Sequence, residues 1–242
     1  MMEIDNKNIP KHIAVIMDGN GRWAKKKGKN RLFGHQNGVK ALKKLIEESA
    51  RLNISYLTLF AFSTENWKRP KKEISTIMRL IVLVLKKELK TMMDNKIKLE
   101  TIGDLEKLPE NVKSNLIKTV NKTKNNNKLT LTGAINYGGK DDISNAFKLL
   151  LEKVKNNIIS PKKIDELIIN NHLYTRNLPD VDLLIRTSGE QRISNFLLWK
   201  IAYAELYFSN VLWPDFNEKC LHDAIISYQN RERRFGKTSD QI

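Results

Sequence analysis

The chain has 242 residues, which is long enough to bury a hydrophobic core without disulfide bonds. It carries 43 Lys and Arg against 27 Asp and Glu, a formal net charge of +16, and one cysteine, so an internal disulfide framework is excluded. Its longest apolar run, Leu80 to Leu85, is far shorter than the ~20 residues of a membrane-spanning helix. We therefore expect a cytoplasmic protein that folds as a single domain over residues 1–242.

Most of the positive charge comes from lysines that are spread along the whole chain. Phosphate neutralisation by such charge is typical of nucleic-acid-binding proteins, but no basic motif of that kind stands out here. The arginines instead lie inside short motifs, and a guanidinium can bind a phosphate through two parallel hydrogen bonds. We therefore predict small anionic ligands and no nucleic-acid partner, with these arginines as candidates: Arg22, Arg31, Arg69, Arg186 and Arg192.

The first predicted strand, over residues 13–16, ends in the motif Asp18-Gly19-Asn20-Gly21-Arg22. The two glycines permit a tight turn, and helix formers follow, so N–H groups at a helix start would face an anion. Asp18 would repel a phosphate unless a divalent cation lies between the two groups. The motif therefore predicts a diphosphate site that uses Mg²⁺. It fits neither a P-loop, by its glycine spacing, nor a dinucleotide site, since the expected downstream acid is missing.

Strands and helices alternate in the prediction. Apolar runs predict strands over 13–16, 56–62, 98–102, 128–135 and 181–185, and helical periodicity predicts helices over 34–52, 70–92, 109–124, 141–154, 161–171 and 217–235. This alternation is typical of an α/β fold with a mostly parallel sheet, in which the carboxyl ends of the strands meet at one edge. The polar stretches 63–70 and 186–195 should therefore face the same crevice as Asp18.

Two features leave alternatives open. The helix over 70–92 is unusually apolar, so it is either a buried central helix or the wall of an apolar cavity. Glu205 lies in an aromatic and aliphatic run, and because an isolated buried carboxylate is costly, it is paired, metal-bound or at an interface.

Five blocks of the chain, in order, resemble the cis-prenyltransferases: residues 12–23, 62–70, 136–139, 182–199, and 202–208 with 213–216. The resemblance implies a single α/β domain with a mostly parallel sheet, flanking helices and a hydrophobic tunnel, paired as a homodimer. It also implies the reaction, a Mg²⁺-dependent condensation of isopentenyl diphosphate onto (2E,6E)-farnesyl diphosphate with cis geometry. The product would be undecaprenyl diphosphate, the precursor of a carrier lipid for peptidoglycan synthesis, released through transient contact with a membrane surface.

The same resemblance implies roles for individual residues. Asp18 and Asn66 would be catalytic, and Asp18 and Glu205 would bind the metal. The substrate-binding residues would be Gly19, Asn20, Gly21, Arg22, Trp23, Arg31, His35, Ser63, Thr64, Glu65, Trp67, Arg69, Arg186, Arg192, Ile193 and Ser194. A neutral amide is a poor base, so we expect Asn66 to orient groups while a diphosphate oxygen accepts the proton.

Two other classes of function remain as alternatives, a basic RNA-binding protein and a non-catalytic carrier of a lipid diphosphate. Product length depends on the side chains that line the tunnel floor, and the sequence does not distinguish which of four candidates face it: Ile77, Ile81, Leu85 and Leu131.

Overall fold

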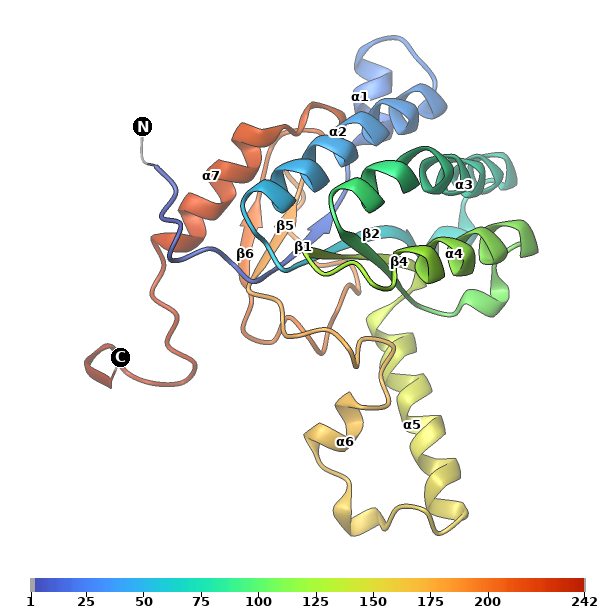
Figure 1. Cartoon of the computed structure of the whole chain (residues 1–242), viewed down its shortest axis with the longest axis vertical. Helices are drawn as coiled ribbons and strands as arrows, with labels where there is room; N and C mark the ends of the chain where they lie inside the picture. The colour runs from blue at the N-terminus through green and yellow to red at the C-terminus, as the bar shows by residue number, and fades with distance from the viewer. Residues whose placement is uncertain (1–2, 242) are drawn as a thin grey trace.

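The computed structural model describes residues 3–241, and within them six parallel strands form one sheet (Figure 1). The strands are β1 (His12–Ile16), β2 (Tyr56–Ser63), β3 (Ile97–Ile102), β4 (Leu129–Tyr137), β5 (Leu183–Arg186) and β6 (Glu205–Phe208). The helices are α1 (Asn20–Lys26), α2 (Arg31–Arg51), α3 (Lys71–Asp94), α4 (Glu110–Thr123), α5 (Gly139–Lys155), α6 (Glu166–Asn170) and α7 (Glu218–Gln229). The predicted α/β class and parallel sheet are therefore confirmed.

The strand order is β3-β4-β2-β1-β5-β6, which puts β1 between β2 and β5. Ile13 is paired with Leu57 on one side and with Leu183 on the other, so the three strands run in step. The polar segments after these three strands consequently meet at one edge of the sheet, as predicted.

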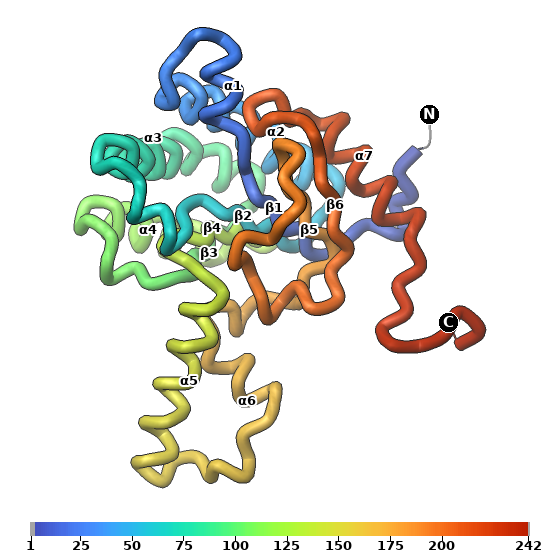
Figure 2. The backbone as a smooth tube through the Cα atoms, turned by 180° about the vertical axis from the view of Figure 1, so that it is seen from behind, coloured from blue at the N-terminus to red at the C-terminus, as the bar shows by residue number. Residues whose placement is uncertain are grey.

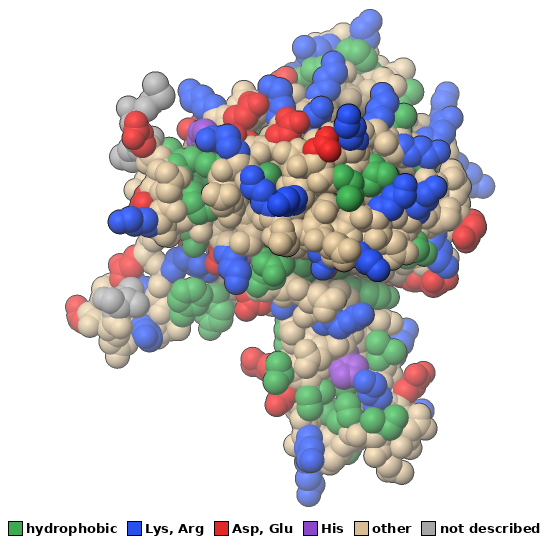
Figure 3. Space-filling view, viewed as in Figure 1, with side chains coloured by type: hydrophobic (Ala, Val, Ile, Leu, Met, Phe, Trp, Pro, Cys, Tyr) green, Lys and Arg blue, Asp and Glu red, His purple; other side chains and the backbone are tan. Residues whose placement is uncertain are grey.

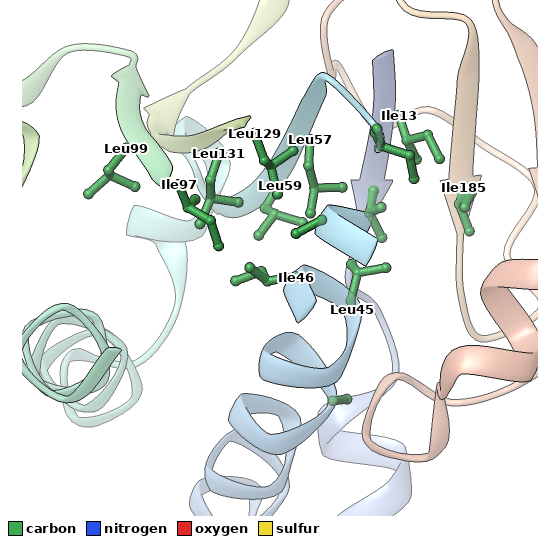
Figure 4. Close-up of a cluster of buried hydrophobic side chains, with 14 of the residues drawn as sticks. Ile13, Leu45, Ile46, Leu57, Leu59, Ile97, Leu99, Leu129, Leu131 and Ile185 are labelled. Atoms are coloured by element: carbon green, nitrogen blue, oxygen red, sulfur yellow. The ribbon is translucent and has the colours of Figure 1, made fainter. Parts of the chain in front are cut away.

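The two faces of the sheet pack differently. Odd-numbered strand residues, among them Leu59, Leu99 and Leu131, point toward the side covered by α2 and α3 (Figure 4). Even-numbered residues such as Ala14 and Ala134 pack instead with buried side chains of the chain that follows β5. This alternation follows from the pleat of a strand, whose successive side chains point to opposite faces. The sheet thus has one large apolar face toward α2 and α3.

Close packing fixes α2 against α1. A Cβ atom at Gly34 would lie 2.0 Å from the carbonyl oxygen of Asn20, and one at Gly38 would lie 2.4 Å from Asn20 Oδ1. Any larger residue would push the two helices apart. The glycines therefore hold the first turns of α2, with Arg31 and His35, beside the edge of the sheet where β1 ends.

Two element predictions are wrong in part, and one strand was missed. The strand β6 was not predicted, because its four residues lie in a mostly aromatic and aliphatic stretch, 196–208, that shows no clear strand boundary. The helix expected over 161–171 is only α6, since Pro161 starts a separate short turn and Asp165 caps a new helix by accepting from Ile168 N–H. The last helix ends at Gln229, before the arginines that follow it.

An arm projects from the body of the molecule (Figures 1 and 2). It consists of α5, α6 and the segment that joins them, and several of its apolar side chains are exposed. None of the helices in the described range has the length and apolar character needed to cross a bilayer.

Candidate active site

A cavity of about 1010 Å³ begins at the edge of the sheet where β1, β2 and β5 end. Twelve of the predicted site residues line it together: Asp18, Asn20, Arg22, Arg31, His35, Ser63, Glu65, Asn66, Arg69, Arg186, Arg192 and Ser194. They come from chain segments that are far apart in the sequence and are joined by the parallel strands. The predicted crevice therefore exists, and it has a highly polar mouth.

Beyond this mouth the cavity is apolar. It continues between the sheet on one side and α2 and α3 on the other. The four candidate residues for the tunnel floor all line it: Ile77, Ile81, Leu85 and Leu131. Of the two interpretations of the apolar helix α3, the structure supports the cavity wall. The site therefore joins a charged end to a hydrocarbon-lined end.

The central contact at the mouth is an ion pair between Asp18 and Arg186. Arg186 Nη2 donates to Asp18 Oδ2 at 2.9 Å, and Arg22 Nη2 lies 3.3 Å from the same oxygen. Burial opposes ionisation of Asp18, but the hydrogen bond and charge of Arg186, with the charge of Arg22, outweigh it and lower the pKa of the carboxyl. Asp18 is therefore ionised at neutral pH.

Arg186 is held rigidly for this role. It is only 3 % exposed, and its Nη1 donates to the carbonyl oxygen of Arg192 and to Ser194 Oγ, both at 2.6 Å. A guanidinium bound on two sides presents a fixed array of donors, which a lysine could not reproduce. Arg186 thus ties the end of β5 both to Asp18 and to the loop of residues 192–194.

Two acidic residues that were not predicted as site residues form ion pairs with the other arginines of the site. Glu190 binds Arg22 and Arg192, and its Oε1 lies 2.9 Å from Arg22 Nη1. Glu190 lay inside the recognised arginine motif, so its contact with Arg192 was within reach of sequence reasoning. Its contact with Arg22 depends on the pairing of β1 with β5, which no local pattern reveals.

The second acid is Glu73, in the first turn of α3. It binds Arg69 Nη1 at 3.0 Å and Arg31 Nη1 at 3.2 Å, and His35 Nε2 lies 3.9 Å away. Burial lowers the pKa of His35 despite the opposing effect of Glu73, so its ring is neutral at pH 7. The four-residue separation of Arg69 and Glu73 is visible in the sequence, although Arg69 precedes α3 in an extended conformation. The approach of Arg31 and His35 depends on the packing of α2 and has no local signal.

The loop after β2 is ordered by its own side chains. Asn66 Oδ1 accepts from Ser63 N–H at 3.1 Å, which closes the short helical turn Thr64–Lys68. Glu65 Oε1 accepts from Asn195 Nδ2 at 2.8 Å, and this contact joins the loop to the segment after β5. The side chain of Asn66 is thereby fixed at the cavity wall.

Six of the predicted substrate-binding residues do not line the cavity: Gly19, Gly21, Trp23, Thr64, Trp67 and Ile193. Gly19 has φ 109° and caps α1, where a side chain would crowd Leu212 and Ser188. The indole N–H of Trp67 donates to Asn136 at 2.7 Å, and that of Trp23 donates to Asp215 at 2.7 Å. In the structure both tryptophans lie outside the cavity lining and form hydrogen bonds to residues next to the site.

Backbone strain is concentrated in the loop after β5. Ser188, Ser194, Asn195 and Leu197 all have φ between 46° and 81°, the left-handed region that favours glycine. Non-glycine residues persist there only where the surrounding structure imposes the conformation, often at functional sites. This loop carries three groups that contact Asp18 or Arg186: Thr187 Oγ1, the carbonyl oxygen of Arg192 and Ser194 Oγ.

Glu205 lies away from this cluster. It is the first residue of β6, and Leu183 at the start of β5 is its partner in the sheet. Asp18 follows the opposite end of the parallel strands, so the chain does not bring the two predicted metal ligands together. Glu205 Oε2 is instead paired with Arg231 Nη1 at 2.8 Å, one of the alternatives considered for it.

Metal binding is constrained by the available donors. Among residues 3–241 no group of three or more His, Cys, Asp or Glu side chains is placed to hold an ion. Mg²⁺, however, is commonly bound by one or two carboxylates together with substrate phosphates. Asp18, ionised and with a side chain that is 33 % exposed, fits this second mode. The residues present therefore suit a Mg²⁺ shared with an anionic ligand, and not a cage made of protein alone.

The fold and the cavity together define a class: an α/β enzyme whose site has a cationic end for an anion and an apolar end for hydrocarbon. The family model described as "Putative undecaprenyl diphosphate synthase" matches residues 16–236, and the chain belongs to this family of prenyltransferases.

Relatives of known name agree with this assignment. The chain is 54 % identical to the ditrans,polycis-undecaprenyl-diphosphate synthase ((2E,6E)-farnesyl-diphosphate specific) of Haemophilus influenzae, over 98 % of this chain and 100 % of that protein. It is 51 % identical to an isoprenyl transferase of Clostridium tetani, over 97 % and 92 % of the two chains.

Solved structures match the whole fold. Lavandulyl diphosphate synthase from Lavandula x intermedia, in complex with dimethylallyl diphosphate, has a TM-score of 0.93 at 37 % identity and covers 96 % of this chain and 100 % of its own. A probable undecaprenyl diphosphate synthase of Campylobacter jejuni has a TM-score of 0.77 at 38 % identity, covering 98 % and 100 %.

Replacing Arg186 with lysine tests the rigid guanidinium. Arg186→Lys keeps the charge but loses the fork that joins Asp18 to the 192–194 loop, so we expect inorganic diphosphate to bind about tenfold or more weakly. Titration calorimetry measures the affinity, and a melting curve checks the fold. The same substitution at the exposed Arg176 is the control. Equal affinity in the parent and Arg186→Lys would contradict the role given to the guanidinium.

Proposed function

We propose that the protein condenses isopentenyl diphosphate repeatedly onto (2E,6E)-farnesyl diphosphate with cis geometry and so makes undecaprenyl diphosphate. Similarity to bacterial synthases with that specificity in their names, over nearly the whole chain, supports the proposal. The structural observation that carries it is the cationic mouth around Asp18, which opens directly into an apolar cavity. A diphosphate head and a hydrocarbon tail match these two ends. The product would then serve as the precursor of a carrier lipid for peptidoglycan, made in the cytoplasm.

We assign the cofactor Mg²⁺ to Asp18 together with the diphosphate of the allylic substrate. When bound, the ion would neutralise negative charge on the departing diphosphate. A metal role for Glu205 stays a prediction, and the present proposal depends on Asp18 alone. The chain's own contribution at this point is a carboxylate kept ionised by Arg186 and Arg22.

The cations around Asp18 suggest two anion subsites. Arg22 and Arg31, with the first N–H groups of α1 at Asn20 and Gly21, would hold the allylic diphosphate. Arg186, Arg192 and Ser194 would hold the diphosphate of isopentenyl diphosphate, beside the loop of β2. Both sets lie at the mouth of the cavity, so the two hydrocarbon parts would meet next to Asp18. This arrangement places the reactants in contact, which is a large part of the rate enhancement that an enzyme can supply.

The chemical step breaks the allylic C–O bond, forms a new C–C bond and removes a proton from C2 of isopentenyl diphosphate. Arginine charges would stabilise the leaving diphosphate as negative charge develops on it. Asn66 is neutral, and its Oδ1 already accepts from Ser63 N–H, so it is poorly suited to take the proton. We therefore give Asn66 a positioning role and assign the proton to a diphosphate oxygen.

The exposed apolar side chains of the arm support a homodimer. Phe147 is 67 % exposed and Leu167 is 66 % exposed, and Ile143, Phe147 and Leu151 lie at four-residue spacing along α5. Figure 3 shows apolar atoms reaching the surface of the arm. A contiguous exposed apolar surface on a folded domain marks an interaction site, and a two-fold pair of identical arms would cover it.

Transient contact with an anionic membrane is also proposed for product release. No Asp or Glu occurs between Asp18 and Glu47, although this segment contains many lysines and arginines. It forms α1 and much of α2, which border the cavity mouth. Positive charge near the mouth would attract anionic lipid headgroups.

Turnover tests the proposed function directly. Purified protein is incubated with Mg²⁺, farnesyl diphosphate and labelled isopentenyl diphosphate, and the dephosphorylated products are separated by chromatography. We expect long polyprenyl products, and a rate about 10²–10³-fold lower for Asp18→Ala, because the charge next to the leaving group is lost. A chelator should reduce the parent to the same level.

Asp94→Ala, at the exposed end of α3, is the matched control and should keep the parent rate. An Asp18→Ala protein as fast as the parent, or a parent unaffected by chelator, would refute the proposal. Salt-dependent RNA affinity without turnover would favour the RNA-binding alternative. Binding of farnesyl diphosphate without turnover would favour the lipid-diphosphate carrier.

Sedimentation velocity tests the homodimer. Phe147→Asp puts a charge into the proposed contact, so we expect the dimer dissociation constant to rise at least about 30-fold, the ~2 kcal/mol of a buried aromatic anchor. Leu83→Asp, on the exposed side of α3 and 43 % exposed in the parent, is the control. A parent that sediments as a monomer, or a Phe147→Asp protein that dimerises as strongly as the parent, would contradict the arm as the interface.

A further inference from the structure

One glycine lies in the middle of a central strand, on the face that lines the cavity. Gly133 of β4 is flanked in the sheet by Leu59 of β2 and by Thr101 of β3, and all three residues border the cavity. Figure 4 shows Leu59, Leu99 and Leu131 pointing to this same side of the sheet. Gly133 therefore leaves a gap in this wall of the cavity, where the neighbouring strand residues contribute side chains.

The fold itself does not require a glycine at this position. Its φ is not in the left-handed region, and a Cβ atom would meet only Ile135, at 3.5 and 3.7 Å, which is ordinary van der Waals contact. By contrast, a Cβ at Gly103 would lie 2.2 Å from a backbone oxygen. The irregular pairing nearby begins beyond this point, because Leu59 and Phe60 of β2 pair in step with Gly133 and Ala134.

A glycine inside a strand is unfavourable, since it loses more conformational freedom than other residues and packs no side chain. Where one occurs, it often marks a place where a ligand or another backbone comes close. No backbone atom is close to Gly133 on this face. The remaining explanation is space for a ligand in the cavity.

The depth of Gly133 says which part of a ligand would pass it. Ile135 lies nearer the strand end and the mouth, while Leu131 lies two residues deeper on the same strand. On β3, Leu99 and Ile97 also lie below the level of Thr101 and line the deeper part. A hydrocarbon chain growing from the mouth must pass Gly133 to reach these residues. The opposite wall at the cavity is formed by α3, through residues such as Ile77 and Ile81.

We propose that Gly133 is a determinant of product length: the side chain it lacks leaves the passage through which the growing isoprenoid reaches the deep part of the cavity. This inference depends on the proposed prenyl-transfer function. A side chain at this position would project toward α3 and stop elongation earlier, while the charged mouth would be left as it is.

A graded series at this position is the test. Gly133→Ala, Gly133→Val and Gly133→Ile are incubated with Mg²⁺, farnesyl diphosphate and labelled isopentenyl diphosphate, and the dephosphorylated products are sized by chromatography and mass spectrometry. We expect the main product to shorten progressively with side-chain size, by at least one isoprene unit for valine and isoleucine. Melting temperatures should stay equal or rise, because these residues suit a strand better than glycine does.

Thr130→Ile is the matched control. Thr130 lies on the same strand but on the opposite face, next to Tyr56 in the sheet, and does not line the cavity. This variant adds the same kind of bulk and should give the product length of the parent. A shortening by Thr130→Ile equal to that by Gly133→Ile would show a general effect of strand substitution and would overturn the inference.

A parent that makes no polyprenyl product would refute the proposed function itself. A parent that elongates, with valine and isoleucine variants that give the same product distribution, would refute the role of Gly133 alone. If the isoleucine variant does not fold, the alanine and valine variants decide, since the added Cβ meets no atom closer than 3.5 Å.

Discussion

The structure of the site depends on one partly buried ion pair, in which Arg186 at the end of β5 binds Asp18 just beyond the end of β1. Arg186 is the last residue of β5 and Asp18 lies two residues after β1, so the pairing of these neighbouring parallel strands brings the two side chains together. Removing one partner of such a pair leaves the other charge uncompensated, which is costly in a partly buried site. The same guanidinium also holds residues 192–194 of the strained loop after β5, through the carbonyl oxygen of Arg192 and Ser194 Oγ. One interaction thus sets both the charge of Asp18 and the position of the second group of cations.

The alternation of the sheet gives the site its second property. Because most side chains on one face of β2, β3 and β4 are apolar and face α2 and α3, the cavity that starts at charged strand ends continues over a largely hydrocarbon surface. The close approach of α1 and α2 at Gly34 and Gly38 positions Arg31 and His35 at the mouth. The parallel strands thus end together at a charged cavity mouth, and their apolar face lines the rest of the cavity. A ligand with an anionic head and a hydrocarbon tail matches both parts.

Much of this was predictable from the sequence. The strand pattern and the polar segments after each strand predicted that Asp18, Asn66 and Arg186 would meet, since parallel strands share their carboxyl edge. Contacts that depend on how helices pack could not be predicted from the sequence. The ion pair between Arg31 of α2 and Glu73 of α3 is an example. Glu205 was grouped with Asp18 by resemblance, but strand direction separates them. Gly133 gives no local signal either, because a single glycine in a strand has meaning only once its neighbours and the cavity are known.

In the proposed mechanism, the ionised Asp18 binds the substrate diphosphate through a shared Mg²⁺. Titration calorimetry of a non-reactive farnesyl diphosphate analogue, with and without Mg²⁺, measures this coupling in the parent and in Asp18→Asn. We expect Mg²⁺ to strengthen binding to the parent about tenfold or more and to leave the affinity of Asp18→Asn nearly unchanged. An equal strengthening by Mg²⁺ in both proteins would contradict it.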